Sequence, residues 1–323
     1  MANPNVGQRV AANWEAVIGD GPQDNINNDY WMFYQLSKGD GFLGLTGGDF
    51  ITSPLEYALN STVQSYSDTD TISTTRVDVF DRTEAQWKEV AGTVILSDLE
   101  ADRNSGEGTV FPLLAAKMEN AKNSMRSALN TMIFGDGTGN SSKDVNGLQS
   151  LIPTDPTTST SVQAINQGTF TFWRSKQATG TKTTSAFDNL RAAMRSVYNQ
   201  CSNGMGDQHP SVAVTDRATF EGFEGLLLAN ERFTSKEEAD GGFLNENLKF
   251  KGSKLAYDVA CLAGSLYFWN PKFLKLVYKK GSWFKMLPEQ RPSNQTVTVY
   301  PIRSMCQLFT NNRRRLGVVT AIN

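Results

Sequence analysis

Histidine and cysteine are scarce in this chain, and their scarcity excludes several classes of site. Among 323 residues there is one histidine, and the three cysteines lie far apart with no CxxC pair. A zinc site or a disulfide framework needs such residues in close spacing, so we predict no metal site, and we expect Cys201, Cys261 and Cys306 to be buried thiols. His209, in the turn GDQHP, is interpreted as an ordinary turn residue, and a single histidine leaves little material for a nucleophile triad.

Sequence motifs of well-known enzymes are also absent. The chain contains no GxSxG, HExxH or Walker-type loop, and no GxGxxG that follows a strand. The segment GDGTGN at 135–140 follows a predicted helix, whereas a phosphate-binding loop precedes one, so we interpret it as a helix stop and turn. Glu237 and Glu238 fall in a charged stretch typical of a solvated loop. We predict no catalytic residue and no cofactor, although two distant carboxylates would suffice for glycosidase chemistry.

The charge balance and the lack of long apolar runs limit the partners of this chain. Thirty-one basic and 33 acidic residues give a net charge of −2, without the basic tail that condenses nucleic acid. No segment reaches the roughly 18 consecutive apolar residues of a membrane span, and no signal peptide is recognisable, so we expect assembly in a cytoplasm. The dense basic cluster Arg313, Arg314 and Arg315 is typical of a solvated strand end. An ion pair between subunits and a contact to enclosed nucleic acid are the alternatives.

What the chain does contain is an abrupt change of period near residue 100. From 51 to 97 the sequence is polar, with short stretches in which apolar and polar residues alternate. We predict three strands separated by polar turns, with strands at Leu55–Tyr66, Ile72–Phe80 and Trp87–Leu96 and turns at 67–71 and 81–86. Such a hairpin is marginal in water by itself and needs other surfaces to lie on.

A long helix is predicted soon after this stretch, over 110–134. Its apolar residues keep steps of three and four, which places them on one narrow stripe: Phe111, Leu114, Met118, Ala121, Met125, Ala128 and Met132. Thr109 is a suitable N-cap and Gly135 a suitable C-cap, and about 25 residues give a rod of roughly 37 Å. A long extended arm joined to a long helix indicates a building block of an assembly rather than an enzyme.

Residues 1–50 form a Gly- and Asn-rich arm with one aromatic group, Tyr30, Trp31, Phe33 and Tyr34. Two interpretations of this group stay open. The rings can belong to a short amphipathic helix on the core of their own subunit. Alternatively they can dock on a neighbouring subunit, since few other apolar residues nearby would cover them.

The C-terminal half has the mixed pattern of an α/β layer. We predict a helix from 185 to about 204, a short strand over 211–215, and a second helix capped by Asp216. The Thr- and Ser-rich stretch 153–184 is predicted to be loops around one strand at Phe170–Trp173. Further strands are predicted at Leu248–Tyr257, Ser265–Trp269, Leu274–Lys279, Val297–Ile302, Met305–Thr310 and Leu316–Ile322.

Several strings follow these elements in a characteristic order. They are FGDGTGN with NGLQSLI after the long helix, SVAVTDRATFEGFEGLL in the α/β layer, LKFKGSKLAYD, LYFWNPKFLKLVY and the closing LFTNNRRRLGVVTAI. Together with the element order they resemble the major capsid proteins of tailed bacteriophages, which have the Hong Kong 97 capsid fold. The resemblance covers essentially the whole chain and implies an α+β fold. It implies an N-terminal arm 1–50, an extended β-hairpin loop 51–97, a peripheral domain 98–184 with a spine helix 110–134, an axial domain 185–295, and return strands of the peripheral domain at 296–323.

This resemblance implies a structural protein and not an enzyme. Its subunits would form hexamers and pentamers that close into an icosahedral shell around double-stranded DNA, without sequence-specific binding. The shell would be a virion capsid assembled in the host cytoplasm, with separate scaffolding, portal and decoration proteins as further partners and no membrane. We predict inter-subunit contacts at Trp31, Tyr34, Val77, Val79, Phe80, Trp87, Lys88, Arg313, Arg314 and Arg315.

Three alternatives within and outside this reading stay open. In one branch of the family a loop lysine forms an isopeptide bond to a neighbour, but Lys88 lies in the return strand, which favours a salt bridge. An encapsulin-like nanocompartment shell shares the fold and encloses protein cargo. A carbohydrate-active enzyme or binding module, favoured by the many Thr, Asn and aromatic residues, would be compact and would not need the stretch 51–97.

Overall fold

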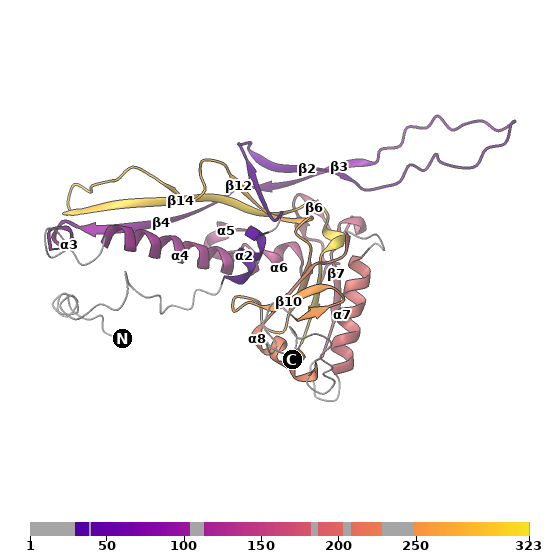
Figure 1. Ribbon diagram of the computed structural model, residues 1–323. Coiled ribbons are helices and arrows are strands. Elements are labelled where there is room, and N and C mark those ends of the chain that lie inside the picture. Colours follow the sequence, from indigo (N-terminus) through magenta and orange to yellow (C-terminus); the bar gives the residue numbers. More distant parts are fainter. Residues whose placement is uncertain are drawn as a thin grey trace.

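The computed structural model describes residues 30–38, 40–103, 113–181, 187–202, 208–227 and 248–322. Figure 1 shows a long helix beneath long paired strands, a wedge-shaped lobe at one end of them, and a narrow arm that projects away from both. Within these ranges no helix is long and apolar enough to cross a membrane. The main core lies where helix, strands and lobe meet, and it contains Phe134, Trp269, Leu276 and Leu308.

The first large sheet is built around its longest strand, β14. This strand pairs in antiparallel fashion with β4, β12 and β13, and β1 adds to β12 in parallel. The two strands predicted between 297 and 310 form one strand, because Arg303 and Ser304 continue the pairing with β4 without a break. The members are β1 (Phe42–Leu45), β4 (Lys88–Ser97), β12 (Leu274–Lys279), β13 (Lys285–Met286) and β14 (Val297–Thr310).

The long helix α4 (Leu113–Phe134) lies along one face of this sheet and ends directly before Gly135, as predicted. The predicted N-cap and first residues lie outside the described ranges. Met125, from the predicted stripe, is buried against β4 and β14. A second face with Leu129 and Ile133 is buried in the main core. The prediction of a single stripe is therefore wrong for the C-terminal half of α4, because this half is covered on more than one side.

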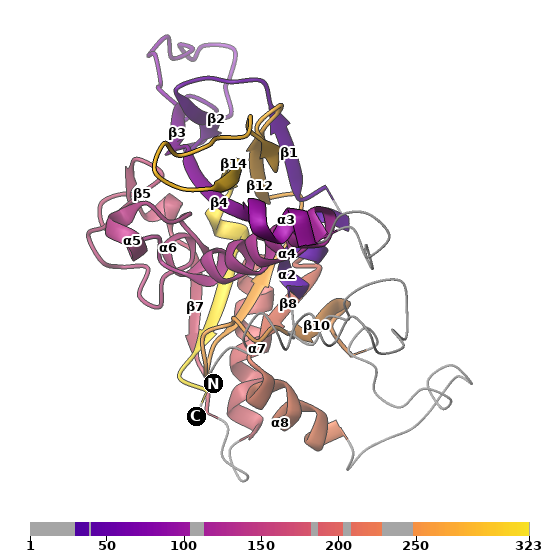
Figure 2. The same ribbon diagram turned by 90° about the vertical axis from the view of Figure 1, so that its left-hand side faces the viewer.

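The short helix α2 (Trp31–Lys38) covers this second face of α4. Its residues Met32, Phe33 and Leu36 are buried, and the backbone N–H of Phe33 donates to Asn130 Oδ1 of α4 at 3.0 Å. Figure 2 shows α2 and β4 on different sides of α4. The interpretation of the aromatic group as part of a helix on its own core is confirmed for Tyr30, Trp31 and Phe33, whereas Tyr34 is exposed.

The wedge-shaped lobe contains a second, six-stranded sheet in the order β7-β15-β11-β8-β10-β9. Two helices accompany it, and the second is capped as predicted, because Asp216 Oδ2 accepts a hydrogen bond from the Thr219 N–H at 3.2 Å. The predicted strand Leu248–Tyr257 is split by a turn at Lys251 and Gly252, which both have positive φ. The elements are β7 (Lys176–Thr179), α7 (Phe187–Cys201), β8 (Val212–Thr215), α8 (Arg217–Leu227), β9 (Lys249–Phe250), β10 (Ser253–Tyr257), β11 (Leu266–Trp269) and β15 (Gly317–Thr320).

Short elements between α4 and β7 connect the two sheets. The predicted strand at Phe170–Trp173 is wrong, because the 3-10 turn η3 (Thr171–Trp173) instead buries the Trp173 ring, whose Nε1 donates to Val162 O at 2.9 Å. Gly147 is required by close approach, since a Cβ there would lie 2.4 Å from the carbonyl oxygen of Ile133. The other elements of this stretch are α5 (Gly139–Ser142), α6 (Leu148–Leu151), β5 (Ser161–Val162) and β6 (Ile165–Asn166). A second 3-10 turn, η6 (Arg313–Arg315), lies between β14 and β15.

Candidate interaction surfaces

The projecting arm begins as a two-stranded ribbon of β2 (Phe50–Glu56) and β3 (Phe80–Gln86). Beyond the ribbon, residues 57–79 contain no strand, so the strands predicted at 55–66 and 72–80 are wrong except at their ends. The turn predicted at 81–86 is wrong as well, because Thr83 and Ala85 are buried at the base of the arm and the stretch pairs with β2. Alternation alone does not make a strand where no surface covers the apolar side chains.

The arm exposes large apolar side chains along its outer part. Leu59, Val63, Ile72 and Phe80 are 87%, 80%, 68% and 67% exposed. These are high values for aliphatic and aromatic residues, and they lie on one projecting segment rather than singly over the surface. The predicted contact residues Val77 and Val79 are half-buried. The sequence analysis singled out Phe80 but missed Leu59, Val63 and Ile72, although the lack of any local core was the signal for all of them.

The base of the arm is fixed to its own subunit. Ile51 and Ala85 pack with Phe309 and Val277 of the first sheet, and the half-buried Trp87 packs against the same cluster. The Trp87 indole Nε1 donates to the carbonyl oxygen of Gly48 at 2.9 Å. The arm is therefore anchored at its base, and within the described residues the apolar side chains beyond the ribbon have no comparable cover.

A groove between β4 and α4 forms a second candidate surface. It has a volume of about 720 Å³ and is lined mainly by apolar side chains, among them Val90, Val94 and Met125. In the described part of the chain no strand pairs with the outer edge of β4. An open strand edge above an apolar floor is a site to which another extended segment can add.

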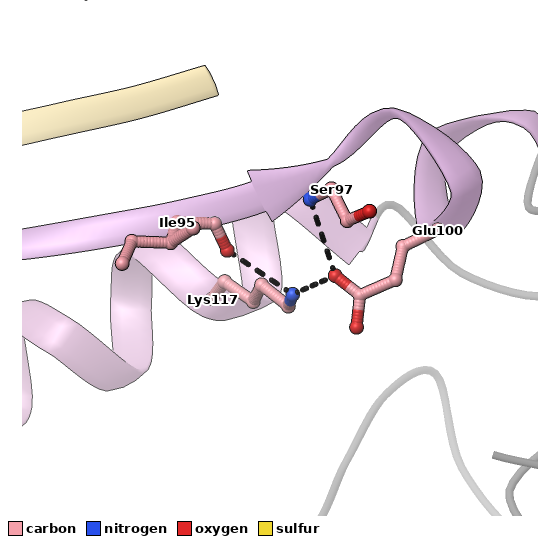
Figure 3. A network of polar contacts seen from close by, with 4 residues as sticks. All are labelled: Ile95, Ser97, Glu100 and Lys117. Atoms are coloured by element: carbon pink, nitrogen blue, oxygen red, sulfur yellow. Dashed lines mark hydrogen bonds and ion pairs between the residues drawn. The ribbon is translucent and has the colours of Figure 1, made fainter. Parts of the chain in front are cut away.

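A polar network at the end of β4, shown in Figure 3, contributes Ile95 and Lys117 to the lining of this groove. The Lys117 ammonium lies 2.6 Å from Glu100 Oε2 and donates to the carbonyl oxygen of Ile95 at 3.3 Å. The same carboxylate oxygen accepts from the Ser97 N–H at 3.5 Å, which ties the helix α3 (Asp98–Arg103) to the end of β4. Along a strand of an antiparallel pair, successive backbone carbonyl groups alternate between facing the partner strand and facing away from it. The carbonyl group of Ile95 is one of those that face away from β14.

The arginine cluster is divided between the interior and the surface. Arg313 is fully buried, and its three guanidinium nitrogens donate to Leu151 O at 2.8 Å, Trp173 O at 2.9 Å and Gln167 Oε1 at 2.8 Å. Burial lowers its pKa to about 9. The expectation of a solvated strand end is therefore wrong for Arg313, because the turn η6 directs this side chain inward.

The other two arginines differ from Arg313 in their surroundings. Arg315 is half-buried and donates to Cys201 O at 3.1 Å and Gln208 Oε1 at 2.8 Å. Burial lowers the pKa of Arg315, and the neighbouring charge of Arg314 lowers it further. Arg314 is exposed. Of the three, Arg314 offers its side chain most freely to a neighbouring molecule.

The remaining predicted contact residues lie on the body of the subunit. The Lys88 ammonium donates to the carbonyl oxygen of Ser142, so this lysine lies at the start of β4 and not on the arm. Trp31 is half-buried against the main core, whereas Tyr34 is 47% exposed with the Lys38 ammonium 5.0 Å from its ring centre. The structure does not bring the predicted contact residues into one patch. They are spread over α2, the arm, β4 and η6.

The three cysteines and the single histidine of the chain all lie among the described residues. No group of three or more His, Cys, Asp or Glu side chains among them could hold a metal ion. The three cysteines are buried, as expected, and burial raises the pKa of both Cys201 and Cys306 to about 12, which keeps these thiols protonated at neutral pH. His209 is half-buried, and its ring stacks on Tyr198 with 6.0 Å between ring centres.

Comparison with known proteins gives the fold a context. No model of a known protein family matches the sequence, and no curated protein matches it. Solved structures do match over essentially the full length. The cyanophage A-1(L) capsid chain has a TM-score of 0.70 at 14% identity and covers 96% of this chain and 97% of its own. The capsid chain of the native GTA particle has a TM-score of 0.63 at 12% identity, with 100% of both chains covered.

A third match is the SrpI encapsulin of Synechococcus elongatus PCC 7942, with a TM-score of 0.57 at 11% identity over 100% of this chain and 97% of the encapsulin. At such identities a structural match establishes the fold alone. The chain therefore has the α+β Hong Kong 97-type fold that the phage capsid chains share.

Proposed function

We propose that this chain is the major capsid protein of a tailed-phage-type particle, a structural subunit without enzymatic activity. The observation that carries the proposal is the arm: it is anchored at its base, projects from the body, and exposes Leu59, Val63 and Ile72 at its outer part. Exposing these side chains costs free energy unless another surface covers them. Copies of the same chain supply such a surface in a closed shell.

The parts of the chain take distinct roles in this proposal. Residues 51–97 are the extension loop that lies over an adjacent subunit, and α4 is the spine of the peripheral domain. The lobe built on the second sheet is the axial domain, which meets its symmetry mates in hexamers and pentamers. The sheets cross the boundaries proposed from the sequence, since β12 and β13 belong to the first sheet and β7 and β15 to the second.

The groove between β4 and α4 supports the same proposal. Its apolar floor and the open edge of β4 suit an extended segment supplied by another copy. Assembly then stabilises both the groove and the segment that fills it. Trp31, Tyr34, Val77, Val79, Phe80, Trp87, Lys88, Arg314 and Arg315 remain the predicted contact residues, and Tyr34, Phe80 and Arg314 are exposed. Arg313 leaves this set because its side chain is buried in its own subunit.

The shell is proposed to enclose double-stranded DNA without sequence-specific binding. A net charge of −2 does not drive condensation of nucleic acid, so the DNA must be brought in by other proteins. A portal, a scaffold and decoration proteins are the proposed partners, in a virion assembled in the host cytoplasm. The Lys88 contact to Ser142 favours a structural role for this lysine over a crosslink.

Electron microscopy of the expressed chain tests the proposed function. We expect capsomers or closed shells. Monodisperse monomers or dimers under every condition of salt, pH and protein concentration would contradict it.

An encapsulin-like nanocompartment is the second candidate, favoured by the full-length match to the SrpI encapsulin. The contents of the shell separate the two. Nuclease-protected DNA inside the particles supports the capsid, whereas a co-purifying enzyme in DNA-free particles supports the nanocompartment. A compact carbohydrate-active enzyme or binding module is disfavoured by the projecting arm.

A further inference from the structure

A small module beside the base of the arm links the arm to the C-terminal strands. It consists of the β5–β6 hairpin and the turn η3, and we call residues 161–173 the buttress. The backbone N–H of Glu84, in β3, donates to the carbonyl oxygen of Gln163 at the tip of this hairpin, at 3.2 Å. The buttress thus contacts the arm directly through Gln163, which belongs to no strand of the two large sheets.

The tip of the β5–β6 hairpin has an uncommon backbone. Gln163 and Ala164 have φ of 52° and 68°, a left-handed conformation that a two-residue hairpin turn usually reserves for Asn-Gly. Residues with a Cβ keep such a conformation only where the surroundings enforce it. Here the side-chain amide of Gln163, oriented so that both its atoms are satisfied, donates to Thr310 O at 2.8 Å and accepts from Thr310 N at 3.0 Å.

A second contact lies where the ribbon of the arm ends. The Tyr57 ring stacks on Phe172 of the buttress, with ring centres 5.3 Å apart and an interplanar angle of 27°. The Tyr57 N–H donates to Val79 O at 3.0 Å, and its hydroxyl donates to Asp78 O at 2.9 Å. Tyr57 therefore holds both limbs of the arm together and fastens them to the body.

The buried Arg313 joins the buttress to the turn η6. This guanidinium donates to the Trp173 carbonyl and to the Gln167 side chain, and the Trp173 indole donates to Val162 O at 2.9 Å. A continuous set of contacts therefore runs from η6 through the buttress to the arm. Arg313 therefore supports the base of the arm as well as the turn η6.

We propose that the buttress fixes the angle at which the arm leaves the subunit, with Phe172 and Gln163 as positioning residues. The inference rests on the proposed function, because the angle matters only if the arm must reach another copy. Each limb of the loop 57–79 can extend by about 36 Å, so a change of about 10° at the base moves the tip by about 6 Å. Such a displacement exceeds the width of an apolar contact and would misplace the tip on its target.

The test compares Phe172→Ala with its neighbour Phe170→Ala. Phe170 is 45% exposed, and its ring centre lies 5.7 Å from that of Phe172. The substitution Phe170→Ala therefore removes a side chain of the same size but leaves the stacking of Tyr57 on Phe172. Nitroxide labels at Thr69→Cys on the arm and Arg195→Cys on α7 report the angle in the unassembled chain, since the native cysteines are buried. We expect F172A to broaden the distance distribution by about 6 Å and F170A to leave it unchanged.

Two further variants make the result independent of one side chain. Phe172→Tyr keeps the ring and should restore the narrow distribution, whereas Gln163→Ala keeps the backbone but loses the amide pair with Thr310 and should broaden it. Q163A also decides the question if F172A fails to fold. In assembled particles, F172A and Q163A should give shells of mixed diameter, and F172Y and F170A uniform shells.

Wild-type distance distributions in both F172A and Q163A would overturn the proposal, as would equal broadening in F170A. These outcomes are separate from failure of the proposed function. Absence of shells from the wild-type chain would refute the capsid while the distances could still show a fixed arm. Uniform shells from F172A would refute the buttress while the capsid stands.

Discussion

Removing the outer part of the arm should separate folding from assembly. Deletion of residues 60–76 keeps Tyr57 and its contacts to Asp78 and Val79, and it shortens the loop between β2 and β3 from roughly 23 residues to about six. Each halving of a loop recovers about 0.6 kcal/mol of closure entropy, so the free energy of unfolding should rise by about 1 kcal/mol. The deletion removes no residue of the buried core.

The same deletion should weaken shell assembly, although it stabilises the isolated subunit. The deletion removes Val63 and Ile72, and replacement of the adjoining Leu59 by serine completes the loss of the three exposed aliphatic side chains. Burying each of them contributes at least about 1.5 kcal/mol, and every 1.4 kcal/mol is tenfold in an equilibrium constant. The concentration at which shells form should therefore rise about a thousandfold, as measured by light scattering and sedimentation, while urea unfolding shows an intact subunit.

Point variants of the full-length arm provide the control. Leu59→Ser, Val63→Ser and Ile72→Ser together should suppress assembly as the deletion does, whereas alanine at the exposed Ser65, Thr71 and Thr74 should not. Assembly of the deletion variant at the wild-type concentration would refute the reasoning. So would a lower free energy of unfolding, because it would mean that the loop belongs to the core of its own subunit.

Three substitutions test buried contacts in the body of the subunit. Asp258→Asn should lower the free energy of unfolding by about 2–3 kcal/mol in a denaturant titration. The buried carboxylate accepts a hydrogen bond from Met32 N at 3.0 Å, and the substituted amide would place its NH₂ group against that N–H donor. An unchanged denaturation midpoint would contradict this. Arg313→Leu should cost at least about 3 kcal/mol in the same titration, since it leaves buried oxygens unpaired. A neutral effect would show that the hydrogen bonds of Arg313 are dispensable. Gly147→Ala should lower the unfolding temperature and cost about 1–3 kcal/mol, because its Cβ would meet the Ile133 carbonyl oxygen; wild-type stability would refute the close approach.

Elements whose periodicity coincides with burial could be predicted from the sequence. The helix α7 and the strands β8, β11 and β12 lie within the predicted ranges because one face or both faces of each are buried, and Asp216 caps α8 as predicted. The C-cap signal of Gly135 placed the end of α4 correctly, and heptad spacing identified the helix itself. Heptad spacing did not show that α2 covers a second face, because that contact depends on Asn130 and on the distant Asp258. A buried polar pair looks like a surface pair in a sequence.

The candidate surfaces were less accessible to sequence reasoning. Alternation at 57–79 predicted strands that do not form, since the segment has no covering surface within one subunit. In a sequence, a run of three arginines resembles a solvated strand end. The buried Arg313 can be told from the exposed Arg314 only when the conformation of the turn η6 is known. The turn at Gln163 carries no Gly or Asn signal because contacts from Thr310 hold it in place.

A cryo-EM reconstruction of particles assembled from the full chain tests the central claim most directly. The account predicts a closed shell in which residues 57–79 of each subunit lie on a neighbouring copy, with Leu59, Val63 and Ile72 covered there. A map in which this segment stays in solvent, or folds back over its own subunit, would contradict it.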